Sequence, residues 1–419
     1  MNGSTLSVTE QGVTYPKGFR ASGVASGIKR SLRPDLALLV SDREASAAGV
    51  FTTNRIRAAP VLLTEEILAR QGGMSRGVVV VSGVANALTG PEGYADSARV
   101  IELAEQALGA SHGSLLHAAT GVIGPRIPLP AIERHIGAAV EALAPTREGG
   151  FRAASAILTT DTTTKEAAVA VKLADGTRVR VAGMAKGSGM IAPSLAPPHA
   201  TTLAFLSTDA KVDTEDLQTV LNQEADRTFN MVSVDGDTST NDTVLLFANG
   251  AAGGCSAGKD PAFVRAVGAV LEQLAKAVAR DGEGATKMLT VHVAGAEDAA
   301  EARSAAKAIA RSVLVKTALF GADPNVGRIA CALGYSGARF DASRLRVDLR
   351  EKGNRWPLIQ NGTPVPGLDN GMGHRLHALL RRMDEVVLEV ELGNGVADAT
   401  AWGCDLSYGY VHINAHYRT

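Results

Sequence analysis

The chain has 419 residues, 45% of them apolar and 20% charged, and its 42 basic side chains almost balance its 43 acidic ones. This charge balance argues against a nucleic-acid-binding surface, and the absence of an uninterrupted apolar run of about 18 residues or more argues against a membrane-spanning helix. At roughly 100 to 200 residues per domain, the length predicts two or three compact units whose core needs no disulfide or metal.

The first predicted elements are a strand, a helix and a hairpin. Residues 77–82 form a short β-branched run, which is typical of a buried strand. Apolar residues then recur at helical spacing over residues 94–108. Residues 168–173 and 177–182 alternate in polarity on either side of an Asp-Gly pair, which tight turns favour. We therefore predict an antiparallel hairpin there.

The longest predicted helix covers residues 260–280. An Asp-Pro pair suits its start, and its apolar residues repeat at helical spacing. A strand over residues 288–293 and an alanine-rich helix over residues 298–313 follow. The chain becomes richer in arginine and loops from there on, which predicts a domain boundary near residue 290.

Helices and antiparallel strands are mixed without regular βαβ spacing, which favours an α+β layered fold over a doubly wound parallel sheet. The N-terminal segment lacks the basic and then apolar order of a signal peptide, so we expect a cytoplasmic protein. Cys255, Cys331 and Cys404 are widely spaced, which argues against a disulfide framework or a metal site. The sequence also lacks the common phosphate-loop, HExxH and GxSxG signatures.

The most distinctive stretch is the Gly- and Pro-rich segment 183–210, in which Ala200 and Thr201 precede a predicted strand over residues 202–206. By itself this stretch is typical of a loop that enters a buried strand. Several segments together, in their order along the chain, carry more weight. These segments are 118–124, 158–165, 185–193, 200–204, 233–242, 281–287, 313–318, 323–328 and 410–419.

On these segments, the chain resembles the ornithine acetyltransferase family of glutamate N-acetyltransferases over nearly its whole length. The resemblance implies a layered α/β/β/α sandwich of the self-processing acetyltransferase and aminopeptidase kind. It implies a main catalytic domain over residues 1–290 and a smaller C-terminal α/β domain over residues 291–419, whose tail returns to the active site. Residues 411–413 alternate in polarity, and we expect that tail to dock as a strand.

Members of that family are made as one precursor that cuts itself between an Ala and a Thr. The resemblance therefore implies cleavage between Ala200 and Thr201, with Thr201 as the nucleophile. A Thr hydroxyl needs an adjacent base, and the α-amine of a new N-terminal Thr, with a pKa of about 8, provides one on the same residue. The resemblance also assigns the oxyanion donors to the Thr120 hydroxyl and the Gly121 N–H, which would receive the charge on the carbonyl oxygen.

The family's substrate-binding set corresponds here to Thr159, Lys186, Thr201, Glu283, Asn414 and Thr419. An amino acid such as ornithine has a carboxylate and two amines, so it needs a cation and at least one anion around it. Lys186 is the matching cation and Glu283 the matching anion. The free α-carboxylate of Thr419 is a further partner for an ammonium.

The resemblance implies transfer of the acetyl group from N-acetylornithine to glutamate through an acetyl-Thr201 intermediate in arginine biosynthesis. It implies no cofactor, with acetyl-CoA as an additional co-substrate in some relatives, and α and β chains from one precursor in an α2β2 heterotetramer. Residues 194–199 are an insertion relative to the family, and Val81, Leu88 and Val326 replace its usual Asn, Cys and Trp. Two alternatives therefore stay open: a related self-cleaving amidase, aminopeptidase or specialised-metabolism acyltransferase, and a non-catalytic amino-acid-binding paralogue.

Overall fold

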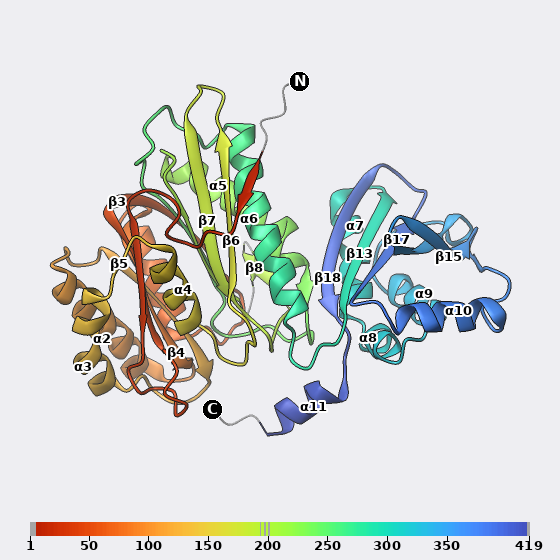
Figure 1. Ribbon diagram of the computed structural model, residues 1–419, viewed down its shortest axis with the longest axis horizontal. Helices are drawn as coiled ribbons and strands as arrows, with labels where there is room; N and C mark the ends of the chain where they lie inside the picture. The colour runs from red at the N-terminus through yellow and green to blue at the C-terminus, as the bar shows by residue number, and fades with distance from the viewer. Residues whose placement is uncertain (1–5, 193, 197, 200–201, 417–419) are drawn as a thin grey trace.

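The computed structural model describes residues 6–192, 194–196, 198–199 and 202–416. Two β-sheets, one of 11 strands and one of 7, pack with α-helices in the arrangement of Figure 1. Parallel and antiparallel pairs occur in both sheets, and helices cover them. The α+β fold class predicted from the sequence is confirmed.

The larger sheet has the strand order β1-β6-β7-β10-β12-β3-β4-β5, with β2, β8 and β9 at its side. Its strands are β1 (Ser7–Thr9), β2 (Phe19–Val24), β3 (Leu36–Thr52), β4 (Met74–Val84), β5 (Leu115–Val122), β6 (Lys165–Lys172), β7 (Arg178–Lys186), β8 (Ser194–Ala196), β9 (Pro198–His199), β10 (Leu203–Thr208) and β12 (Thr243–Ala248). Its helices are α1 (Ala59–Arg70), α2 (Gly90–Leu108), α3 (Leu129–Glu141), α4 (Arg147–Ala156), α5 (Thr214–Arg227) and α6 (Pro261–Arg280), and the short 3-10 helix η1 (Phe229–Met231) directly follows α5 in the chain.

The long strand β3 belongs to both layers into which this sheet folds. Its first part pairs with β2 and β4, and its second part pairs with β12. The side chains of β10 alternate between two hydrophobic cores: Phe205 packs in the core with β4, β5 and α1 to α4, while Leu206 packs in the core with α5 and α6. The order of layers is therefore helix, sheet, sheet, helix, as predicted, and Figure 1 shows α2 and α3 on one outer side.

The second sheet has the strand order β11-β18-β13-β17-β14-β15-β16. Its strands are β11 (Val232–Ser233), β13 (Met288–Ala296), β14 (Arg346–Glu351), β15 (Asn354–Gln360), β16 (Thr363–Pro364), β17 (Glu385–Glu391) and β18 (Ala397–Cys404). The helices of this region are α7 (Ala299–Arg311), α8 (Val313–Phe320), α9 (Val326–Gly334), the 3-10 helix η2 (Ala342–Arg344), α10 (Gly371–Leu380) and α11 (Tyr408–Ala415). One hydrophobic core joins α6 to β13 and β18, and the division into residues 1–290 and 291–419 stays a prediction.

Local sequence signals account for most of these elements. The Asp260 carboxylate accepts a hydrogen bond from the Ala262 N–H at 2.7 Å and caps α6, whose apolar face is buried as predicted. The hairpin of β6 and β7 turns at Gly176, which has a φ of +90°. The alanine-rich helix expected over residues 298–313 is confirmed as α7, which ends at Arg311, and the Ser312 hydroxyl caps the next helix, α8.

The strand expected at the C-terminus is wrong, because residues Tyr408–Ala415 form helix α11. The Ser407 hydroxyl accepts a hydrogen bond from the Gly409 N–H at 3.0 Å and starts the helix. Val411 is 62% exposed, so the alternation of apolar residues does not bury a strand face. In the part of the chain that the structure describes, no helix has the length and apolar character needed to cross a membrane.

Candidate active site

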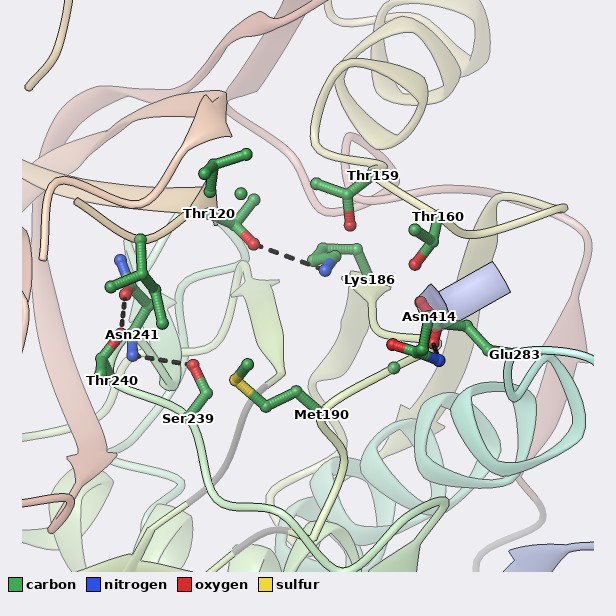
Figure 2. Close-up of a pocket in the computed structure, with 14 residues that line it drawn as sticks. Thr120, Thr159, Thr160, Lys186, Met190, Ser239, Thr240, Asn241, Glu283 and Asn414 are labelled. Carbon is green, nitrogen blue, oxygen red and sulfur yellow. Dashed lines mark hydrogen bonds between the residues drawn. The ribbon is translucent and has the colours of Figure 1, made fainter. Parts of the chain in front are cut away.

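A cavity of about 300 Å³ opens where the ends of β5 and β7 meet the loop before β12 (Figure 2). It is lined by all the predicted site residues that the structure describes, namely Thr120, Gly121, Thr159, Lys186, Glu283 and Asn414. Ala200, Thr201 and Thr419 lie outside the described residues. The cavity has further lining residues for which the sequence predicted no role: Val122, Ile123, Thr160, Gly189, Met190, Ser239, Thr240 and Asn241.

Thr120 and Gly121 lie near the end of β5, where this strand runs parallel to β4. Gly121 has a φ of +134°, and a Cβ there would lie 2.3 Å from the carbonyl carbon of Gly83. Only glycine fits this close approach of two backbones. The Thr120 hydroxyl faces Lys186, whose Nζ donates to Thr120 Oγ1 at 3.4 Å (Figure 2).

Lys186 ends β7 and is 4% exposed. Burial lowers the pKa of its ammonium, and the negative charge of Asp161 opposes that shift. The Asp161 Oδ2 atom lies 4.0 Å from Lys186 Nζ. The cavity therefore contains a buried cation with its counter-ion directly behind it.

Asp161 belongs to a buried ion network that the sequence did not reveal. Its Oδ1 accepts hydrogen bonds from Lys165 Nζ and the Gly187 N–H, both at 2.7 Å. Lys165 Nζ also donates to Asp281 Oδ2 at 2.5 Å. Burial opposes ionisation of Asp161, yet the charges of Lys186 and Lys165 hold its pKa at about 2.

Glu283 and Asn414 form the opposite side of the cavity. Asn414 Nδ2 donates to Glu283 Oε2 at 2.7 Å, which ties α11 to the loop after α6. The Glu283 N–H donates to the Ser188 carbonyl at 3.0 Å. A Cβ at Gly189 would lie 2.3 Å from the Glu283 carboxyl carbon, so a larger residue at this position would have to displace the carboxylate.

Met190 has a φ of +55°, and its backbone is held by Asp235. The Asp235 carboxylate accepts from the Met190 N–H at 2.6 Å and from the Ile191 N–H at 2.9 Å. Tyr410 of α11 donates its hydroxyl to Asp235 at 3.3 Å. Asp235 thus connects the loop after β7 with the C-terminal helix.

Asn241 fixes the wall next to Thr120. Its Nδ2 donates to the carbonyls of Ala85 at 2.6 Å and Ala119 at 2.8 Å, and its Oδ1 accepts from the Thr240 hydroxyl at 2.6 Å. The segment 233–242 stood out in the sequence, but the contacts of the Asn241 amide with Ala119 of β5 and with Ala85, directly after β4, could not be predicted from it.

Thr202, the residue after the predicted nucleophile, is buried next to Asp242 and Gly187. Burial holds the pKa of the Asp242 carboxyl well above its usual range, and the Thr202 backbone N–H and the Lys186 charge oppose this rise. Leu203 then pairs with Lys186 in the sheet, so the strand after Thr201 begins beside the cavity.

The cavity combines a cation, an anion, hydroxyls and a backbone N–H around a space that fits a small zwitterion with an acyl group. Among the described residues, no group of three or more His, Cys, Asp or Glu side chains is placed to hold a metal ion.

Sequence comparison relates the chain to proteins of arginine biosynthesis. The ArgJ family model matches residues 20–419. The arginine biosynthesis bifunctional protein ArgJ of Synechocystis sp. is 45% identical over 423 residues, covering 98% of this chain and 99% of that protein. The protein of the same name from Symbiobacterium thermophilum is 46% identical over 414 residues, covering 97% and 98%.

Solved structures were also matched. The arginine biosynthesis bifunctional protein argJ of Bacillus halodurans is 35% identical, with a TM-score of 0.44, and covers 46% of this chain and 100% of that chain. The ornithine acetyltransferase of Mycobacterium tuberculosis in complex with ornithine is 42% identical, with a TM-score of 0.43 and the same coverage of 46% and 100%. The family model and the sequence identities, each over nearly the whole length, show that this chain belongs to the ArgJ family of arginine-biosynthesis enzymes.

Proposed function

We propose that this protein transfers the acetyl group of N-acetylornithine to glutamate through an acetyl-Thr201 intermediate. The observation that carries the proposal is the cavity that gathers Thr120, Gly121, Lys186 and Glu283, the oxyanion pair and the two charges that an amino-acid amide needs. Membership of the ArgJ family supports the same reaction.

In the first half-reaction, the α-amine of the processed Thr201 takes the proton of its own hydroxyl, and the hydroxyl oxygen attacks the acetyl carbonyl carbon. The Thr120 hydroxyl and the Gly121 N–H donate to the oxygen that becomes negative. When the amide C–N bond breaks, the ammonium of Thr201 returns the proton to the leaving nitrogen. Ornithine leaves, and the acetyl group remains on Thr201 as an ester.

In the second half-reaction, the neutral α-amine of glutamate attacks the ester carbonyl. The same two donors stabilise the same oxygen, the bond to Thr201 breaks, and the glutamate nitrogen gives up a proton that restores the Thr201 hydroxyl. The product is N-acetylglutamate. Both half-reactions use one set of groups, as a double displacement requires.

Substrate recognition follows from the charges. Lys186 binds the α-carboxylate, and Glu283, fixed by its hydrogen bond from Asn414, binds the second ammonium of ornithine. Thr159 also lines the cavity, and the terminal carboxylate of Thr419 is proposed to bind an ammonium.

The proposal includes the maturation of the protein. The precursor cuts itself between Ala200 and Thr201 in the cytoplasm, and the resulting α and β chains assemble as an α2β2 heterotetramer. Acetyl-CoA is a candidate second acetyl donor, and no other cofactor is required by the chemistry.

Intact-mass measurement of the purified protein tests the processing step and should give two fragments that meet between Ala200 and Thr201. Incubation with acetylornithine and glutamate should yield ornithine and acetylglutamate. Release of acetate in the absence of glutamate would instead favour the alternative that the protein is an amidase. Thr201→Ala should abolish cleavage and lower the rate of acetyl transfer by more than about 10⁴-fold. An uncut Thr201→Ala variant that still transfers acetyl groups would show that Thr201 is not the nucleophile.

A further inference from the structure

The Thr120 hydroxyl is constrained by its neighbour Lys186. An ammonium has three protons and no acceptor, so in the 3.4 Å contact Lys186 Nζ must donate and Thr120 Oγ1 must accept. The hydroxyl therefore keeps its own proton for another partner. Within the described part of the chain Thr120 Oγ1 donates to no acceptor, so this proton is available to a group in the cavity.

The position of Lys186 depends in turn on Asp161. The carboxylate lies 4.0 Å from Lys186 Nζ through Oδ2 and accepts the N–H of the next residue, Gly187, at 2.7 Å through Oδ1. It thus fixes both the ammonium and the backbone that follows it. Two contacts from one carboxylate leave Lys186 little freedom to turn away from Thr120.

Asp161 is itself held from two further sides. Lys165 Nζ donates to its Oδ1 at 2.7 Å, and the Thr159 N–H donates to its Oδ2 at 3.1 Å. It is 5% exposed and does not line the cavity, so it has no contact with a substrate there. Any effect that Asp161 has on the reaction must pass through the groups that it contacts, which are Lys186, Lys165 and the backbone N–H groups of Thr159 and Gly187.

We propose that Asp161 is a positioning residue of the oxyanion site, which holds the Lys186 ammonium against Thr120 and so keeps the Thr120 proton directed into the cavity. This inference rests on the proposed role of Thr120 as an oxyanion donor. It gives Lys186 a second task, the orientation of a hydroxyl, beside the binding of a carboxylate.

The charges around Lys186 predict that loss of Asp161 changes the pH dependence of kcat. Asp161, Glu283 and Asp242 favour its protonated form, whereas burial and the charges of Lys165 and Lys29 disfavour it. Without Asp161 the pKa of Lys186 falls further, and the ammonium loses its proton at lower pH. A neutral amine can accept as well as donate, so the Thr120 hydroxyl is then free to turn its proton toward Lys186.

The test compares Asp161→Asn with the matched variant Asp281→Asn. Both remove a carboxylate that accepts from Lys165, but only Asp161 also contacts Lys186. Asp161→Asn should lower kcat by about 10- to 100-fold, which is less than the loss of about 10²- to 10³-fold known for removing a whole oxyanion donor, and should raise KM by less. In the pH profile of kcat, the alkaline limb should move to lower pH for Asp161→Asn and should stay in place for Asp281→Asn.

A second background isolates the route through Thr120. In Thr120→Val, which has no hydroxyl to orient, Asp161→Asn should cost less than about threefold in kcat. An equal loss in both backgrounds, with an unmoved alkaline limb, would overturn the proposal and leave Asp161 a purely structural residue. If Asp161→Asn does not fold, Asp161→Glu, which displaces the carboxylate by one methylene, takes its place in both comparisons.

The failure of this proposal differs from failure of the proposed function. If the wild-type protein transfers no acetyl group, the proposed function is wrong. The positioning role of Asp161 is then tested by crystal structures of the wild type and of Asp161→Asn, without activity measurements. A displaced Lys186 Nζ in Asp161→Asn supports it, and an unchanged contact with Thr120 overturns it.

Discussion

Gly121 combines a backbone conformation that favours glycine with a proposed role as an oxyanion donor. Gly121→Ala should lower kcat by about 10²- to 10³-fold with little change in KM, because a Cβ 2.3 Å from the Gly83 carbonyl carbon must displace the N–H that is proposed to donate to the oxyanion. Steady-state kinetics with acetylornithine measure both constants. Gly124→Ala is a matched control, because Gly124 has a similar φ of +111° but open space around its Cβ position. If the two variants were equally active, the close approach would not position the donor.

At the residue scale, the sequence predicted residues that line the cavity but not the contacts that hold them in place. Thr120, Lys186 and Glu283 stand in recognisable segments, and all three line the cavity. Asp161 and Asp281 are far apart in the sequence and are joined by Lys165, which donates to both carboxylates. Neither composition nor spacing can predict such a contact, because it depends on how β6 and α6 pack.

At the scale of elements, local sequence signals predicted a helix correctly where its cap and its apolar face lie in one segment. They failed at the C-terminus, where a capping residue favours a helix over the strand that the apolar pattern suggested. The helix α6 has its cap, its first-turn proline and its apolar stripe within one segment. In α11, by contrast, one Ser407 cap outweighs an alternation of apolar residues that suggested a strand.

The helix α11 contacts the cavity residues but adds no buried side chain to the hydrophobic core. None of its described side chains is buried, whereas its Asn414 donates to Glu283 at 2.7 Å. Deleting the chain from Tyr408 onward should therefore shift the melting temperature by only a few degrees and raise KM for acetylornithine by about 10- to 100-fold, the range of a hydrogen bond to a charged group. Calorimetry and steady-state kinetics measure the two effects.

Tyr410→Phe is the milder comparison for α11. It removes only the hydroxyl contact with Asp235, and KM should rise by about tenfold or less. A large loss of thermal stability in the deletion variant would show instead that α11 is needed for folding.

The buried ion network affects the stability of the whole molecule. The pKa of Asp161 is about 2 in the fold despite burial, because Lys186 and Lys165 favour its charge, whereas an unfolded Asp has a pKa of about 3.9. Because the folded value is the lower one, this stabilisation is complete above about pH 4 and is lost as the pH falls through about 2. Urea unfolding over this window should show a loss of about 2–3 kcal/mol from this group in the wild type.

Asp161→Asn should lack that part of the acid destabilisation, so its unfolding free energy should depend less on pH over the same window. Curves with equal slopes for the two proteins would show that Asp161 does not titrate with the fold.

The overall layering could be predicted through the resemblance, but the path of the chain through the larger sheet could not. The order β7-β10-β12-β3 places two strands that follow Thr201 between two strands that precede Ala200. Such long-range pairing has no signature in local sequence, because any apolar strand could take the place of another.

This strand order predicts the behaviour of the two halves. Expressed separately, residues 1–200 and 201–419 should aggregate, because each would expose unpaired strand edges at the centre of the sheet. Protein that is cut after folding should elute as one particle in size-exclusion chromatography and give two bands on a denaturing gel. Soluble, monomeric separate halves would contradict the interleaved sheet.

The interleaved strands also predict how long a protein cut between Ala200 and Thr201 would last. Before the proposed cut, the peptide bond keeps the two halves at high effective concentration while the sheet closes. In the cut protein, halves that separate must find each other again in competition with aggregation. We therefore expect unfolding of the cut protein to be irreversible, so that its working lifetime depends on the rate of unfolding and not on an equilibrium between folded and unfolded chains.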